Sequence, residues 1–209
     1  LNDCDIFEEL NLSDGKYIKI SNLNKYPIVN VLADEFVDMI INKSRISLLN
    51  AKNVPTLIIN NTTIKNFKVE FLKDITFDNV KIKESCSFPK LEELEIRNSC
   101  IFYKDIEFQE IRTASILKSK FVANIKFNEN IESLSINNSK LYGEVLFSNI
   151  NNLVFSDSIF VEELNLSESS YSHLMIVDTT FEKNIDFKNT LVDDINIFSN
   201  LELDNSKTI

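Results

Sequence analysis

The sequence predicts an all-β protein that folds as a right-handed parallel β-solenoid with coils of about 20 residues. Three observations lead to this expectation. An apolar template recurs along most of the 209 residues, no segment between residues 54 and 200 has the apolar stripe of a helix, and only two residues are glycine. Tight hairpin turns favour glycine, so a chain this poor in glycine must change direction in another way.

The repeating template is Φ-x-x-Φ-x-Φ-x-x-σ-x-Φ, in which Φ is a large apolar residue and σ is a small one. Successive matches lie 18 to 21 residues apart. The matches begin at Val54, Leu72, Leu91, Ile111, Ile131, Ile150 and Tyr171. Self-similarity at such a period is typical of a repeat fold, in which each unit buries its apolar edge only against its neighbours.

The second half of each unit carries an apolar pair with a spacing of two residues, such as Val69 with Phe71 or Ile125 with Phe127. This spacing indicates extended segments whose alternate side chains point inward. Together with the template, the pairs predict a coil of four sides with about five residues on each. About nine such coils would stack at the parallel-strand spacing of ~4.8 Å.

The small σ position is expected to lie inside a corner of the coil. Six of its seven residues carry a hydroxyl: the set is Thr62, Val80, Ser99, Ser119, Ser139, Ser158 and Thr179. Either each hydroxyl bonds to the backbone of a neighbouring coil, or the corner admits only a small side chain. The preceding residue is often Asn or Asp, which adopt left-handed turns at low cost and can replace glycine there.

The chain is expected to have three parts. Residues 54–200 form the regular solenoid, residues 1–53 form irregular coils that cap it, and residues 201–209 are a tail. Within the first part, the positions of Leu32, Phe36, Met39 and Ile40 match one face of a helix, which predicts a short helix near 33–43.

Two repeat families share these residues. The run from Ile131 to Leu141 resembles the core of leucine-rich repeats, with Ser in place of the usual Asn and no helix in the returning half. The small-x-aromatic triplets that start at Ser119, Ser158 and Thr179 resemble pentapeptide-repeat proteins. The coil length favours the pentapeptide-like solenoid, and a leucine-rich-repeat solenoid without helices is the alternative. Neither resemblance implies a catalytic residue.

Charge and cysteine content limit the classes of function. The net charge is −10, which disfavours direct binding to nucleic acid through its phosphates. No apolar run is long enough to span a membrane. We expect no metal and no cofactor, since the chain has one His, three scattered Cys and no glycine-rich phosphate loop. The lack of a disulfide framework and of a visible leader favours a cytoplasmic protein.

The two cysteines of the repeat region are assigned from their template positions. Cys86 falls at an inward position and is expected to behave as a small core residue, whereas Cys100 follows the corner residue Ser99 and is expected to face outward.

Stacked coils place the outward residues of equivalent positions in columns. Near the C-terminal end these columns bring together Val154, Met175, Val177 and Phe198, with His173 nearby. Adjacent exposed apolar residues often mark an interaction surface. We therefore expect another protein to bind here, with a homodimer through an uncapped end as an alternative.

The leading functional hypothesis is a non-enzymatic scaffold for protein–protein interaction. One alternative, implied by the pentapeptide resemblance, is an acidic rod that mimics DNA and occupies a DNA-binding enzyme. A second is a polysaccharide-active β-helix enzyme, which would need two converging carboxylates. The sequence offers acidic pairs for this role at Glu8/Glu9, Glu92/Glu93, Glu162/Glu163 and Asp193/Asp194.

Overall fold

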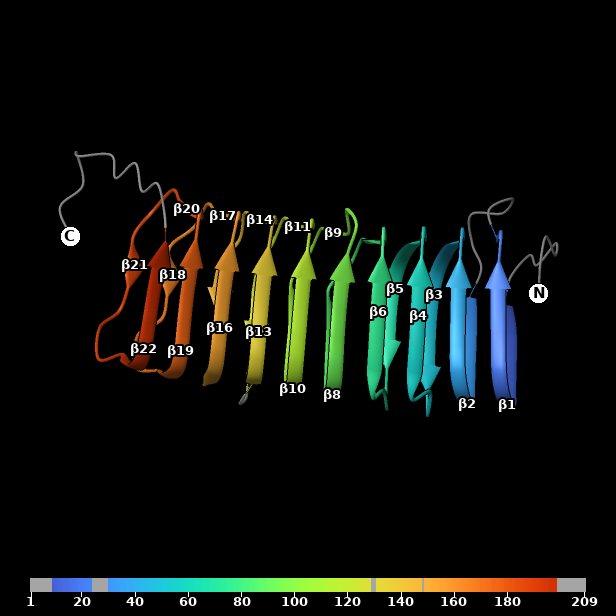
Figure 1. Ribbon diagram of the computed structural model, residues 1–209. Helices are drawn as coiled ribbons and strands as arrows, with labels where there is room; N and C mark the ends of the chain where they lie inside the picture. Colours follow the sequence, from blue (N-terminus) through green and yellow to red (C-terminus); the bar gives the residue numbers. More distant parts are fainter. Residues whose placement is uncertain (1–8, 24–29, 129–130, 148, 199–209) are drawn as a thin grey trace.

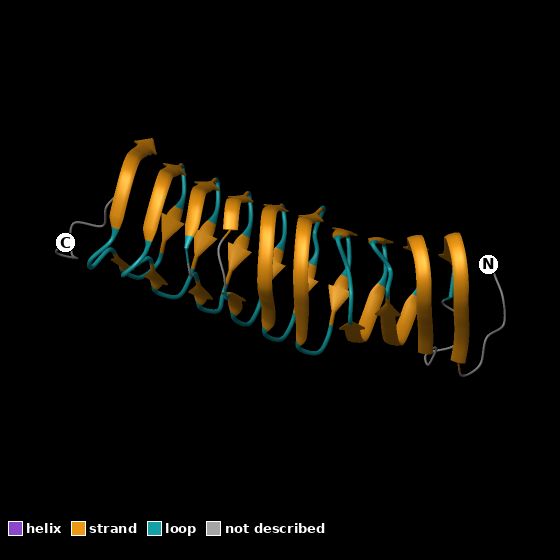
Figure 2. Cartoon of the chain, turned by 90° about the horizontal axis from the view of Figure 1, so that it is seen from below, coloured by secondary structure: helices purple, strands orange, loops and turns teal. Residues whose placement is uncertain are grey.

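The computed structural model describes residues 9–23, 30–128, 131–147 and 149–198. Within these ranges the chain forms 22 strands and no helix, and so contains no helix that could cross a membrane. The strands pair in parallel and belong to one continuous coiled sheet, which confirms the predicted parallel β-solenoid with about 20 residues per coil. The coils follow one another along a single axis from the N-terminal to the C-terminal end (Figures 1 and 2).

One side of the solenoid carries one strand from each coil, and these strands lie next to each other as a row in Figure 1. These strands are β1 (Glu9–Ser21), β2 (Asn30–Asn42), β4 (Thr56–Asn60), β6 (Asp74–Asp78), β8 (Cys86–Arg97), β10 (Ile106–Leu117), β13 (Ile131–Asn137), β16 (Ile150–Ser156), β19 (Ser170–Val177) and β22 (Leu191–Phe198). We call them the long row.

The remaining strands form the other sides. The first group is β3 (Arg45–Lys52), β5 (Thr63–Val69), β7 (Lys81–Ile82), β9 (Ile101–Phe102), β11 (Lys120–Phe121), β14 (Lys140–Leu141), β17 (Ile159–Phe160) and β20 (Thr180–Phe181). The second group is β12 (Ile125–Phe127), β15 (Val145–Leu146), β18 (Leu164–Asn165) and β21 (Ile185–Asp186). It extends a row that starts with the first halves of β8 and β10, since the first half of β10 pairs with both β8 and β12.

The core is a stack of identical positions from successive coils. Phe88, Phe108 and Phe127 follow each other with ring centroids 5.1 and 5.3 Å apart and nearly parallel planes. Phe102 and Phe121 stack in the same way on another side, at 4.9 Å. Such stacks bury large apolar areas and fix the register between coils, because a shift of one residue would turn each ring out to solvent.

Asn and Asp form the corners, as the sequence predicts. Among the described residues, fifteen other than glycine have positive φ, and ten of these are Asn or Asp. Neither Gly15 nor Gly143 has positive φ. Both glycines instead mark close approaches: a Cβ on Gly143 would lie 2.3 Å from the carbonyl carbon of Ala123 in the preceding coil. The shortage of glycine therefore follows from corners that short polar side chains can form.

The corner hydroxyls bond to the backbone, which confirms the first of the two interpretations. The Oγ of Ser139 donates to the carbonyl of Asn137 (2.8 Å) and accepts from the N–H of Ser119 in the preceding coil (3.1 Å). The N–H of Ser139 in turn donates to the Oγ of Ser158 (3.2 Å). We use the name corner column for the buried residues at this corner of successive coils. Its members are Ser44, Thr62, Val80, Cys100, Ser119, Ser139, Ser158 and Thr179.

The prediction for the corner at Ser99 is wrong by one residue. Ser99 is exposed, and Cys100, expected outside, is fully buried in the corner column. Asn98 and Ser99 both have positive φ, so the corner holds one extra residue and the next side chain turns inward. Phe102 therefore fills the core position that the template gives to Ile101.

The expected short helix near 33–43 is also wrong, because residues 33–42 lie in β2. Val31 and Ala33 point inward, Glu35 turns the chain with a φ of 61°, and Met39 and Ile41 point inward beyond this corner. Two extended runs joined at a corner thus reproduce the apolar spacing of a helix.

The N-terminal coils are part of the same sheet. Strand β1 pairs with β2, and β2 pairs with both β3 and β4 in the register of the later coils. A second template error lies in the first unit of the regular repeat: Phe71 is exposed, and the inward residues of β5 are Ile64 and Phe67. The predicted tail, residues 201–209, lies outside the described residues.

Candidate interaction surface

The predicted surface residues lie together on the long row at the C-terminal end. Val154 in β16 is paired with Met175 in β19, and Val177 in β19 is paired with Phe198 in β22. Their side chains point outward because the alternate residues, such as Leu174, fill the core. Four apolar residues from three neighbouring coils therefore form one face, which we call the apolar face.

Exposure differs across the apolar face. Phe198 is 58 % exposed and Met175 36 % exposed, whereas Val154 and Val177 are half-buried between their neighbours. The face is flat, since its residues stand on adjacent parallel strands. A flat apolar area of this kind can contact a second macromolecule but offers no enclosed space for a small ligand.

His173 lies on the same strand as Met175 and is exposed. Its Nδ1 is 3.5 Å from the Oδ2 of Asp194 on β22, so the two form an ion pair when the imidazole is protonated. In the preceding coil, the residue paired with His173 is Asn152. His173 therefore adds a polar rim to the apolar face, beside a carboxylate.

An uncapped end was named from the sequence only in general terms, without the residues exposed at the C-terminal coil. Leu191, Ile195, Ile197 and Phe187 are all exposed, although Ile195 and Ile197 occupy the inward positions of β22. Their equivalents one coil earlier, Leu174 and Ile176, are 0 % and 3 % exposed. The apolar template gives no sign of this difference, because Ile195 and Ile197 match it as Leu174 and Ile176 do.

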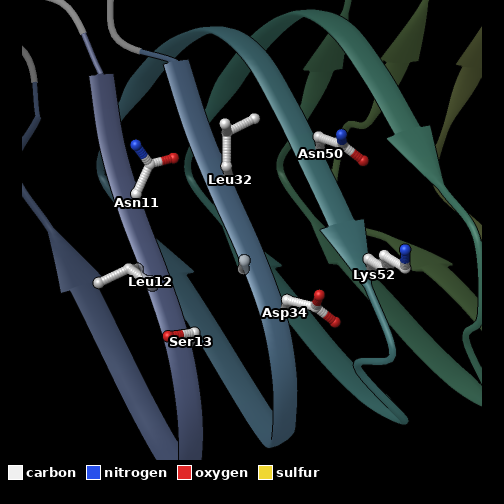
Figure 3. Close-up of a pocket in the computed structure, with 8 residues that line it drawn as sticks. Asn11, Leu12, Ser13, Leu32, Asp34, Asn50 and Lys52 are labelled. Carbon is white, nitrogen blue, oxygen red and sulfur yellow. The ribbon is translucent and has the colours of Figure 1, made fainter.

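A shallow pocket of about 310 Å³ lies at the opposite end of the solenoid, over β1, β2 and β3 (Figure 3). Its lining is mixed: Asn11, Leu12, Ser13, Leu32, Ala33, Asp34, Asn50 and Lys52. The charged groups are already engaged, since Asp34 accepts from the Nδ2 of Asn53 (3.0 Å) and Lys52 pairs with Glu70 (3.4 Å). The pocket has one carboxylate and so lacks the pair that glycoside hydrolysis requires.

A corner next to this pocket holds further carboxylates. A hydrogen bond with Asp14, and the negative charges of Asp14 and Asp34, raise the pKa of Glu35 above its usual range. Glu35 is fully exposed, so this corner is a solvated acidic turn rather than an enclosed site. Over the described residues no group of three His, Cys, Asp or Glu side chains could hold a metal ion.

Ion pairs join adjacent coils along the surface. Arg97 contacts Asp78 in the preceding coil (3.0 Å) and Glu95 on its own strand (2.8 Å), and these carboxylates raise the pKa of the guanidinium further. The other pairs between coils are Lys52–Glu70, Lys73–Glu92, Lys90–Glu110, Arg112–Glu132, Lys126–Glu107 and Lys183–Glu162. Cations thus alternate with carboxylates, and two of the acidic pairs named from the sequence are engaged in this way.

The two described cysteines are buried. Burial raises the pKa of the Cys86 thiol to about 12 and that of Cys100 to about 11. Thiols with such values hold little thiolate at neutral pH and are poor nucleophiles. The inward position predicted for Cys86 is confirmed.

No family model, no curated protein and no solved structure matches this chain.

Proposed function

We propose that this protein is a non-enzymatic scaffold that binds another protein through the apolar face. The observation that supports this proposal is the side-by-side placement of Val154 with Met175 and of Val177 with Phe198 on adjacent strands. Outward positions elsewhere on the long row are mostly polar or charged, for example Glu95 and Ser135 in the column of Met175. A contiguous apolar area among polar columns is typical of a binding surface.

We further propose that the solenoid is of the pentapeptide-repeat kind. The buried small residue followed two positions later by a buried large one supports this assignment, as in Ser119 with Phe121 and Ser158 with Phe160. A leucine-rich repeat would carry an Asn column where this chain has hydroxyls.

The DNA-mimic alternative has less support. A mimic needs a continuous negative face, and the pairs between Lys or Arg and Asp or Glu of adjacent coils interrupt the negative charge. The polysaccharide-active alternative is weaker for a similar reason, because Glu92 and Glu162 face lysines on neighbouring coils instead of converging on a groove.

An affinity purification with matched variants tests the scaffold proposal. The bait carries Met175→Ser with Val177→Ser, and the control bait carries Ile40→Ser with Ile58→Ser, which lie in the same outward column near the other end. We expect a protein that is retained by the wild type and by the control and is depleted at least tenfold with the first variant. Equal recovery with both variants would overturn the proposal.

A further inference from the structure

The row of strands from β3 to β20 carries two adjacent outward columns that differ from the rest of this acidic protein. Strand pairing joins the first column, which is Arg45, Thr63, Lys81, Ile101, Lys120, Lys140, Ile159 and Thr180. The second column lies two residues further along and is Ser47, Lys65, Lys83, Tyr103, Val122, Tyr142, Val161 and Glu182. Between Arg45 and Val161 the two columns hold six basic residues and no acidic one. We call this part the basic stripe.

The cations of the basic stripe are not neutralised by neighbouring coils. On other sides of the solenoid, lysines such as Lys73 and Lys126 pair with carboxylates of an adjacent coil. Among the described residues no carboxylate pairs with Lys120 or Lys140, although the two stand directly opposite each other on β11 and β14. Like charges in this arrangement destabilise a sheet, so an anion between the two ammonium groups would stabilise it.

Two tyrosines hold the ammonium groups in place. The Nζ of Lys83 lies 3.8 Å from the ring centroid of Tyr103. The Nζ atoms of Lys120 and Lys140 lie 4.6 and 4.8 Å from the ring centroid of Tyr142. A cation over an aromatic ring is attracted by the electrons of the ring. These lysine side chains are therefore partly ordered before a ligand arrives, which lowers the entropic cost of binding an anion.

The basic stripe is long and narrow. Arg45 and Lys140 lie five coils apart, which is roughly 24 Å at the parallel-strand spacing. The far edge of the stripe is the next corner, where Glu84, Asp105 and Glu144 are exposed. A bilayer or a nucleic acid duplex is wide enough to meet these carboxylates too, and their repulsion would oppose binding. A single polymer chain can lie along the stripe and avoid them.

We propose that the basic stripe binds a linear acidic polysaccharide, with the carboxylate or sulfate groups of the polymer among the lysines. Short apolar side chains separate the cations, at Ile101, Val122 and Ile159. These side chains suit the C–H faces of sugar rings, and the hydroxyls of Tyr103 and Tyr142 can bond to sugar hydroxyls. The stripe lies on a different side of the coil from the apolar face, so this proposal and the scaffold proposal fail independently.

Other single-chain anions fit the basic stripe less well. Single-stranded nucleic acid is bound by open aromatic faces on which its bases stack, whereas two ammonium groups lie over the ring of Tyr142. An acidic peptide would lay its backbone polar groups against apolar side chains. It could not add to the sheet here, because β9, β11 and β14 each pair with a strand on both sides.

Titration calorimetry at low salt tests this proposal. The ligands are polygalacturonate fragments, which carry carboxylates, and dextran sulfate, with neutral dextran as the control. We expect at least one acidic polymer to bind and neutral dextran not to bind. Lys120→Gln with Lys140→Gln should weaken binding about tenfold or more. Lys73→Gln with Lys126→Gln removes the same charge outside the stripe and should change affinity less than about twofold.

A second stripe variant and two competing ligands complete the test. Lys65→Gln with Lys83→Gln should weaken binding of the acidic polymer as the first stripe variant does. An oligothymidylate and vesicles of phosphatidylglycerol should each bind more weakly than the polysaccharide. Tighter binding of either one, no binding of both acidic polysaccharides, or equal losses in the stripe variants and the control variant would each overturn the proposal.

Discussion

The backbone N–H of Val80 donates a hydrogen bond to the sulfur of Cys100, 3.3 Å away in the next coil. The same sulfur lies 3.1 Å from the carbonyl of Arg97. Cys100 thus makes with sulfur the two contacts that Ser139 makes with oxygen. Every member of the corner column except Val80 therefore carries a short side chain that can both accept and donate, and the hydrogen bonds of the column are buried where water cannot replace them.

Removal of one corner hydroxyl should weaken the whole domain. Ser139→Ala leaves the N–H of Ser119 and the carbonyl of Asn137 without this partner in a buried corner. We expect the free energy of unfolding to fall by about 1–3 kcal/mol in urea denaturation. Ser115→Ala, at an exposed position of the preceding coil, is the control and should change stability by less than about 0.5 kcal/mol. Equal effects of the two variants would contradict this role of the corner column.

Lys118 is a corner residue that does not suit its conformation. It has a φ of 49°, where most corners have Asn or Asp. Lys118→Asn should raise the free energy of unfolding by about 0.5–1 kcal/mol, since Asn tolerates left-handed φ better. The converse change, Asn138→Ala, should lower it by about 1 kcal/mol. Paired thermal and urea melts measure both, and a stabilising Asn138→Ala would refute the explanation for the shortage of glycine.

Gly143 should tolerate no side chain. A Cβ there would lie 2.3 Å from a backbone carbon of Ala123, which cannot move without displacing the preceding coil. Gly143→Ala should cost about 2–3 kcal/mol or more. Gly15→Ala should be milder, because its Cβ would meet the ring of Phe36, a side chain at a terminal coil. A reversed order of the two costs would show that the coils are not packed as described.

The buried thiols predict a loss of stability at high pH. Burial raises the pKa of Cys86 to about 12 and that of Cys100 to about 11, against an ordinary value near 9. Above that ordinary value the unfolded chain loses thiol protons that the folded chain keeps, so alkaline pH favours unfolding. The free energy of unfolding should fall between about pH 9 and pH 11. In Cys100→Ser this fall should be shallower, and an unchanged slope would argue against burial of the thiol.

The period of the chain could be read from sequence because each coil repeats the same inward positions. The corners were predictable for the same reason, since Asn or Asp precedes most corner hydroxyls. The position of Cys100 was not, because an extra residue at Asn98 and Ser99 leaves the apolar pattern intact one place later. Because Ile101 and Phe102 are both apolar, a template that asks only for an apolar residue cannot detect the extra corner residue.

The columns of the candidate surface were also predictable, since outward positions are set directly by the inward ones. Val154, Met175, Val177 and Phe198 lie where the template places them. The uncapped end was named from the sequence without its residues, because the template marks Ile195 and Ile197 as buried. Their exposure depends on whether another coil covers them in space, which the periodicity within a chain does not describe.

Site-specific photo-crosslinking in the source cells tests the central claim most directly. A photoreactive phenylalanine analogue replaces Met175 in one strain and Ile40, in the same outward column, in another. We predict a discrete cross-linked band from position 175 that is absent from position 40 and is lost when Val177→Ser is added. Equal bands from both positions, or none from position 175, would contradict a binding role for the apolar face.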